Sequence, residues 1–224
     1  MTLVTSVLVV RPNQPPRISN MDSINKLTKI FSEFPGIGPR QAKRFVYNLL
    51  QRNREYTTDF IRVLETLHND ISLCANCYRF FVNEKQNMSL CQICRDPNRS
   101  KSELMIVARD IDLENIEKSH AFNGQYFVLG GTIPLMEEEA SKKIRLNEFL
   151  ETVQKHSTNL KEIILGLNAN PEGEYTSLYL MKALKPLTDS HQIKISVLGR
   201  GLSTGTELEY SDTNTIKNAL ENRH

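Results

Sequence analysis

Four cysteines, at Cys74, Cys77, Cys91 and Cys94, form two Cys-x-x-Cys pairs 13 residues apart, and the 224 residues contain no other cysteine. Thiolates in two tight pairs can complete a tetrahedral shell around one Zn²⁺, with no position left for water or substrate. We therefore predict one structural zinc ion per chain. Disulfides or redox pairs are the alternatives, but no export signal is recognisable. We expect the aromatic residues after the first pair to form an apolar floor beneath the metal: Tyr78, Phe80 and Phe81.

A second candidate site is the turn Gly36-Ile37-Gly38, which lies between two prolines. Glycines permit positive φ and carry no side chain, so the N–H groups that open the next helix can face outward and bind an anion. Arg40, Lys43 and Arg44 follow in the first turns. We predict that the turn binds DNA phosphates, independently of base sequence and weakened by salt. The alternative is an ordinary helical hairpin whose glycines only allow a tight turn.

The charge is distributed unevenly along the chain. Residues 1–101 contain 15 Lys and Arg against 8 Asp and Glu, whereas residues 102–224 contain 13 against 18, for a total of +2. A basic half with a zinc module indicates a polyanionic partner, although a charged segment can also be a solvated surface. Because no apolar stretch approaches the roughly 20 residues of a membrane helix, we expect no membrane contact and a cytoplasmic location.

Helical spacing of apolar residues predicts three helices before the cysteines. The first starts near Ile24, after the capping residues Asp22 and Ser23, and ends before Pro35. The second starts at Pro39, and the third leads into the cysteines. Residues 1–20 lack such spacing, so we expect a disordered extension or a misassigned start, with Met21 as the natural first residue. The second helix is expected to bury one face: Ala42, Phe45, Val46, Leu49 and Leu50.

After Cys94, short apolar runs alternate with helical stretches, which is typical of an α/β domain with a mostly parallel sheet. The predicted strands are Leu104–Ala108, Tyr126–Leu129, Glu162–Leu167 and Ile193–Leu198. The predicted helices are Asp112–Ser119, Leu146–Lys155, Glu174–Leu184 and Thr213–Asn222.

From about Asn25 to Leu220, this order of elements resembles the RecR family of bacterial recombination mediators. The matching motifs are Phe34-Pro-Gly-Ile-Gly-Pro-Arg40, the two cysteine pairs, Tyr126-Phe-Val-Leu-Gly-Gly131, Asn168 through Glu174, Arg200-Gly-Leu202 and Leu208-Glu-Tyr210. The resemblance implies a helix-hairpin-helix in 21–73, a zinc finger in 74–97, a Toprim domain in 102–198 and an oligomerisation segment in 199–224.

Resemblance to this family further implies assembly and partners. Its members form dimers or tetrameric rings around DNA, act with RecO and sometimes RecF, and help to load RecA during recombinational repair in the bacterial nucleoid. Residues matching Arg40 and Arg44 face the DNA in that family. We expect the same of this chain.

The pattern of carboxylates argues against catalysis. Catalytic Toprim enzymes end the first strand with Glu and later carry Asp-x-Asp-x-Glu-Gly-Glu, because Mg²⁺ prefers anionic oxygens. Here the matching positions are Ala108, Asn168 and Asn170, and Ala108 departs even from RecR, where Glu is usual. We expect a non-enzyme; the alternatives are a Mg²⁺-dependent nuclease or primase-like enzyme and a zinc scaffold that contacts no DNA. The remaining acidic positions are Asp112, Glu172 and Glu174.

Overall fold

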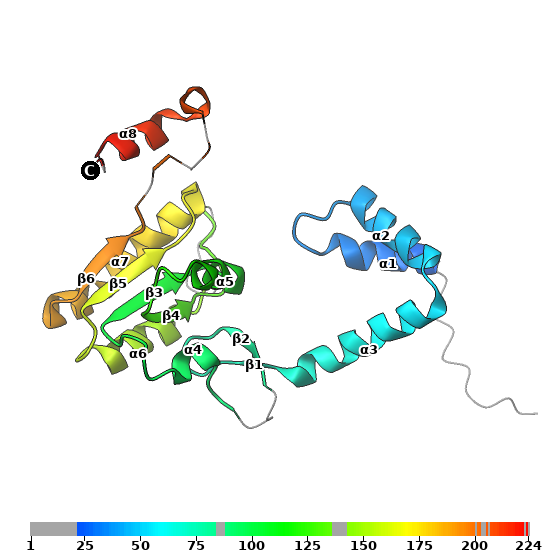
Figure 1. Ribbon diagram of the computed structural model, residues 1–224, viewed down its shortest axis with the longest axis horizontal. Helices are drawn as coiled ribbons and strands as arrows, with labels where there is room; N and C mark the ends of the chain where they lie inside the picture. The colour runs from blue at the N-terminus through cyan, green and yellow to red at the C-terminus, as the bar shows by residue number, and fades with distance from the viewer. Residues whose placement is uncertain are drawn as a thin grey trace, which may run out of the picture. The chain divides into compact units, whose positions relative to one another are not determined.

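The computed structural model describes residues 22–83, 88–135, 143–199, 201–202, 205, 207–221 and 223. The chain divides into two compact units, residues 1–66 and 67–224, and each is described by itself (Figure 1). The expected extension 1–20, Met21 and the motif residue Arg200 lie outside the described residues. No helix in the described part of the chain is long and apolar enough to cross a membrane.

The first unit contains a pair of packed helices, α1 (Ser23–Ser32) and α2 (Pro39–Gln51), with most of α3 (Arg54–Asp70). Asp22 caps α1, since its carboxylate accepts a hydrogen bond from the Ile24 amide at 3.2 Å. The ring of Phe31 in α1 lies edge-on to Phe45 of α2, with 5.8 Å between the ring centroids. The predicted starts of both helices are confirmed.

The predicted buried face of α2 is only partly correct. Ala42 and Val46 are buried, but Phe45 is 37% exposed and Leu50 is 64% exposed. An amphipathic stripe of this width normally faces a core with several neighbours. One packed helix therefore covers only part of the apolar stripe of α2. α3 likewise contains no buried residue.

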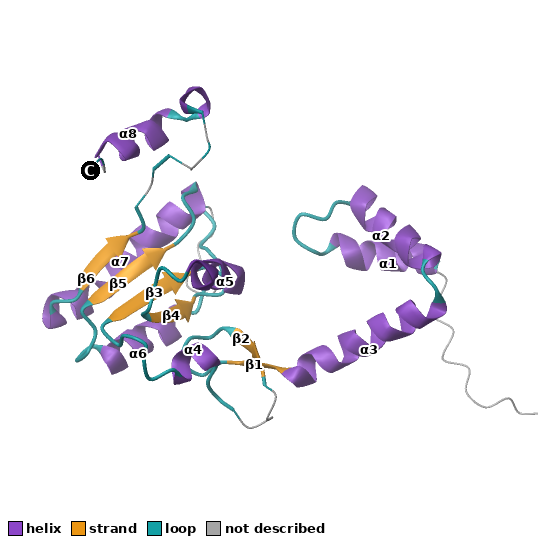
Figure 2. Cartoon of the chain, viewed as in Figure 1, coloured by secondary structure: helices purple, strands orange, loops and turns teal. Residues whose placement is uncertain are grey.

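The second unit is built on a parallel sheet of four strands in the order β4-β3-β5-β6 (Figure 2). All four strands lie within one residue of the predicted positions at each end, which confirms the parallel α/β prediction. In register, Leu104 is paired with Gln125 on one side and with Ile163 on the other. The strands are β3 (Glu103–Val107), β4 (Gln125–Val128), β5 (Glu162–Gly166) and β6 (Lys194–Val197).

Helices pack on the sheet and enclose its main core. The ring centroid of Phe127 in β4 lies 5.3 Å from that of Phe149 in α6, and Leu180 and Leu184 of α7 are fully buried in the same cluster. α7 is longer than predicted at both ends, because Asn170 caps its start and Pro186 is accommodated inside it. The helices after the cysteines are α5 (Asp110–Ser119), α6 (Leu146–His156), α7 (Pro171–His191) and α8 (Thr213–Glu221), with a 3₁₀ turn at Leu208–Tyr210.

A small module with its own two-stranded antiparallel sheet precedes β3. It consists of β1 (Ile71–Leu73), β2 (Phe80–Val82) and the short helix α4 (Gln92–Arg95). Neither three-residue strand was expected from the sequence, because apolar periodicity is not measurable over so short a run.

Replacing Gly173 tests how tightly the start of α7 is packed. A Cβ at this position would overlap the carbonyl oxygen of Asn168, and a backbone atom cannot swing aside as a flexible side chain can. We expect Gly173→Ala to lower the free energy of unfolding by about 1–3 kcal/mol, measured by denaturant titration. Gly199→Ala, where a Cβ meets nothing within 4 Å, is the matched control and should unfold like the parent. Equal stability of the two variants would contradict this account of the turn.

Candidate metal centre and nucleic-acid interface

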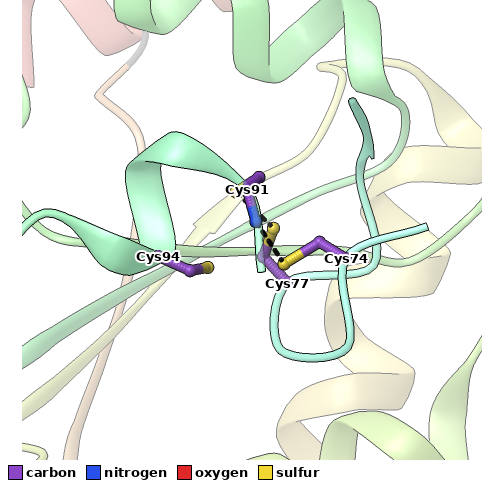
Figure 3. A group of neighbouring side chains, drawn as sticks. All are labelled: Cys74, Cys77, Cys91 and Cys94. Atoms are coloured by element: carbon purple, nitrogen blue, oxygen red, sulfur yellow. Dashed lines mark hydrogen bonds between the residues drawn. The ribbon is translucent and has the colours of Figure 1, made fainter. Parts of the chain in front are cut away.

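The four cysteines converge on one small volume, as predicted. Their sulfur atoms all lie within 4.8 Å of one another, and Cys77 Sγ is 3.6 Å from Cys91 Sγ (Figure 3). Tetrahedral coordination with metal–sulfur bonds of about 2.3 Å places sulfurs about 3.8 Å apart, so the donor set and spacing fit one metal ion. Cys74, Cys77 and Cys91 are buried and Cys94 is half-buried. The cluster could therefore enclose a metal almost completely.

Hydrogen bonding within the cluster separates the acidities of its thiols. The pKa of Cys74 is lowered, chiefly because its sulfur accepts hydrogen bonds from the other three cysteines. The pKa of Cys77 is raised, chiefly by its side-chain hydrogen bonds with Cys74, Cys91 and Cys94. The backbone amide of Cys91 also donates to Cys74 Sγ at 3.3 Å.

The turn after the first cysteine pair is fastened to the parallel sheet. The Val128 amide donates to the Cys77 carbonyl oxygen at 2.8 Å. Arg145 Nη1 donates to the Val128 carbonyl oxygen at 2.9 Å and to that of Tyr78 at 3.3 Å, and the guanidinium carbon lies 5.8 Å from the Tyr78 ring centroid. One side chain therefore joins the cysteine module to β4.

A second link joins the module to the first turn of α5, where the Asp110 carboxylate accepts a hydrogen bond from the Phe80 amide at 2.7 Å. Sequence reasoning missed the linking roles of Arg145 and Asp110. No signal in the sequence pairs either residue with the cysteines, because both contacts join segments that are far apart along the chain.

The expected aromatic floor beneath the metal forms only in part. Phe81 is buried in the cluster that contains the cysteines, whereas Phe80 is 54% exposed. Tyr78 turns away to the main core, where its ring centroid lies 5.2 Å from that of Phe127. Phe80 and Phe81 are consecutive in a strand, so their side chains point to opposite faces and only one can reach the cluster.

In the first unit, the glycine turn is open to solvent. Gly36 has a φ of +77°, which only glycine adopts without strain, whereas Gly38 is extended with a φ of −78° and is the N-cap of α2. A Cβ at either position would meet nothing within 4 Å. Gly38 has no side chain that could cap the first amides of α2, so they remain available to an external acceptor.

Basic side chains surround this helix start. Arg40, Lys43 and Arg44 are all exposed, and Ile37 between the glycines is half-buried. Arg44 donates a long hydrogen bond of 3.4 Å to Gln41 Oε1. The glycine turn, with its free amides and three neighbouring cations, can accept an anion on the protein surface.

The three positions that we expect to match the carboxylates of Toprim enzymes lie where strands of the second unit end. Ala108 follows β3 and is 2% exposed, and Asn168 and Asn170 follow β5. The Asn170 side chain accepts a hydrogen bond from the Gly173 amide at 2.8 Å and caps α7. Sequence reasoning missed this role, although Asn followed by Pro and two acidic residues is a recognisable helix start.

The remaining acidic positions of the Toprim-like pattern are Asp112, Glu172 and Glu174. Asp112 accepts a hydrogen bond from the Arg109 amide at 2.9 Å, Glu172 accepts one from the Thr132 hydroxyl at 3.1 Å, and Glu174 is exposed. Within the described residues, the cysteines are the one group of three or more His, Cys, Asp or Glu side chains whose ligand atoms converge. The three acidic residues form no such group.

Replacing Arg145 tests the link between the cysteine module and β4. Arg145→Met keeps much of the side-chain volume but leaves the Tyr78 and Val128 carbonyl oxygens without this donor. We expect a loss of about 1–3 kcal/mol in stability, measured by denaturant titration. Lys118→Met, at an exposed position of α5, is the control and should change stability by less than about 0.5 kcal/mol. Indistinguishable unfolding curves for the two variants would refute the link.

Comparison with known proteins agrees with this arrangement. Residues 24–68 match the RecR helix-hairpin-helix family, 102–199 the Toprim domain and 201–224 the RecR C-terminal family. The chain is 36% identical over 200 residues to recombination protein RecR of Prochlorococcus marinus subsp. pastoris, covering 89% of this chain and 94% of that protein. It is 33% identical to RecR of Lactobacillus acidophilus (89% and 96%) and 34% identical to RecR of Oenococcus oeni (90% and 96%). The chain therefore belongs to the RecR family of recombination mediators in DNA repair.

Proposed function

We propose that this mediator binds DNA independently of base sequence through the glycine turn Gly36-Ile37-Gly38 and the side chains of Arg40, Lys43 and Arg44. The observation that carries the proposal is the uncapped start of α2, which is open to solvent and surrounded by three exposed cations. Backbone amides and point charges recognise phosphates rather than bases, so affinity would depend on salt and not on sequence.

The metal in this proposal is one structural zinc ion per chain, held by Cys74, Cys77, Cys91 and Cys94. Four thiolates favour zinc over the oxygen-seeking cations Mg²⁺ and Ca²⁺, and a complete shell leaves no site for catalysis. When bound, the ion would hold together a module whose two strands have only three residues each. Its binding energy would be largely folding energy.

We further propose that the chain does not cleave or synthesise DNA strands. Asn170 is engaged in capping α7, and Ala108 offers no ligand to a cation. The acidic positions Asp112, Glu172 and Glu174 would then be remnants of a Toprim site. Such remnants could still serve partner contacts, since exposed carboxylates attract basic surfaces.

Membership of the family extends the proposal to assembly and partners. The chain would form a homodimer or tetrameric ring, act with RecO and RecF and promote RecA loading, in the bacterial cytoplasm at the nucleoid. The C-terminal segment 199–224 is proposed as an oligomerisation element. Its exposed apolar side chains support this assignment: Leu208, Tyr210 and Leu220.

Replacing two arginines tests the DNA contact. Arg40→Ala/Arg44→Ala should weaken binding to a fluorescent oligonucleotide at least tenfold at about 0.1 M salt and lower the slope of log K against log salt by about 2, because each lost phosphate contact removes about 0.7–0.9 from the slope. Lys26→Ala/Lys29→Ala on α1 removes the same charge from exposed positions and is the matched control. An unchanged slope in the arginine variant, or an equal loss in the control, would favour a scaffold that does not contact DNA.

Removing one cysteine tests the structural metal. Cys91→Ala should bind well below one zinc per chain and lose at least about 3 kcal/mol of stability, because structural zinc contributes on the order of 10 kcal/mol to folding. DNA affinity should fall only as an indirect result. Zinc content by mass spectrometry and thermal unfolding are the measurements, with Ser89→Ala at an exposed neighbouring position as the control. A zinc-free Cys91→Ala protein with the stability of the parent would rule out the structural role.

A further inference from the structure

A cavity of about 390 Å³ lies between the cysteine module and the start of the parallel sheet. We call it the amino-edge cavity, because Glu103 and Gln125, the first residues of β3 and β4, line it together with Leu160, which precedes β5. Asn76 contributes from the module and His156 from the end of α6. The substituted Toprim positions follow the strands at the opposite, carboxyl edge of the sheet. The cavity is therefore a separate feature of the second unit.

The charge of the lining favours an anion. Lys101 and Lys155 are both exposed and contribute two positive charges, against a single carboxylate from Glu103. The two lysines come from different elements, the segment before β3 and the last turn of α6. Ammonium groups on flexible stems that converge on one cavity are suited to phosphate, which they bind as point charges.

The remaining lining is suited to a polar, flat ligand body. Asn76 Nδ2 donates to Gln125 Oε1 at 3.3 Å and lies 3.5 Å from Cys94 Sγ, which holds both amides in place at the wall. Asn76 Oδ1 can still accept a hydrogen bond, and Gln125 Nε2 can still donate one. Leu104 and Leu160 supply apolar surface beside them. Small-molecule sites usually combine a few fixed polar groups with an apolar surface. The cavity volume of about 390 Å³ is within the usual size range of such sites.

His156 adds a polar atom that lacks a partner. Its Nε2 is buried and has no hydrogen-bond partner among the described residues. Burial lowers the pKa of the imidazole, and the nearby Lys155 and Lys101 lower it further, which favours the neutral ring. A neutral imidazole can donate or accept one hydrogen bond according to its tautomer. A buried polar atom left unpaired in the free protein calls for a partner.

We propose that the amino-edge cavity binds a nucleoside 5′-phosphate, either as a free mononucleotide or as the terminal nucleotide of a DNA strand. Lys101 and Lys155 hold the phosphate, and the amides of Asn76 and Gln125 contact the edge of the base. His156 supplies a further hydrogen bond. The proposal does not depend on DNA binding at the glycine turn, which belongs to the other unit.

Isothermal titration of the full-length, zinc-loaded protein with dAMP tests the proposal. We expect one site per chain and at least tenfold weaker binding in Lys101→Gln/Lys155→Gln, which removes both charge-assisted contacts. Lys118→Gln/Lys161→Gln removes equal charge from exposed positions that do not line the cavity, and it should bind dAMP like the parent. Deoxyadenosine and inorganic phosphate, which each supply half of the ligand, should bind at least tenfold more weakly than dAMP.

Absence of dAMP binding at millimolar concentration, or an equal loss in both lysine pairs, would overturn the proposal. His156→Leu gives a second readout, since it removes the ring nitrogens without changing the charge at neutral pH. We expect it to weaken dAMP binding at least threefold while the temperature of thermal unfolding is maintained. Unchanged dAMP affinity in this variant would exclude His156 from the site.

Competition distinguishes the two sources of the ligand. The experiment uses the Arg40→Ala/Arg44→Ala protein, so that the glycine turn contributes little, and compares 5′-phosphorylated with 5′-hydroxyl forms of one oligonucleotide. Displacement of dAMP by the phosphorylated form alone assigns the cavity to a strand end, and displacement by neither assigns it to a free nucleotide. Equal displacement by both would indicate general attraction of DNA and would contradict a nucleotide site.

Discussion

The cysteine module of the second unit depends on the convergence of its four sulfur atoms. Its two strands have three residues each, and an isolated two-stranded hairpin is at best marginally stable in water. The module is held from within by the thiol cluster and from outside by hydrogen bonds to β4, α5 and Arg145.

The two edges of the parallel sheet carry different chemistry. At the carboxyl edge, where Toprim enzymes hold a metal, Asn170 caps a helix and Gly173 allows close backbone packing. These contacts stabilise the turn but bring together no cluster of three carboxylates within the described residues. At the amino edge, the cysteine module covers the strand starts and leaves a cavity with a net positive lining. Attachment of the module thus creates a surface that the sheet alone would lack.

Regular elements were predictable because their signals are local. Short apolar runs located all four parallel strands to within one residue, and Asp22 and Pro39 marked the starts of α1 and α2. Burial was predicted less well. Phe45 and Leu50 fit the apolar stripe of α2 yet remain exposed, since periodicity identifies a face but not how much of it a neighbour covers. α7 extends beyond its predicted end, because Pro186 is accommodated within the helix.

The sequence by itself determined which four residues form the cysteine cluster, the glycine turn before α2 and the order of the domains, because each depends on residue types at short, fixed spacings. Only the tertiary structure decided what Arg145 and Asp110 contact and that His156 lines the amino-edge cavity. Each of these placements depends on segments that are distant along the chain, and no local rule relates them. It also decided that Phe81 rather than Phe80 faces the cysteines, since the pleat of β2 sends neighbouring side chains to opposite faces.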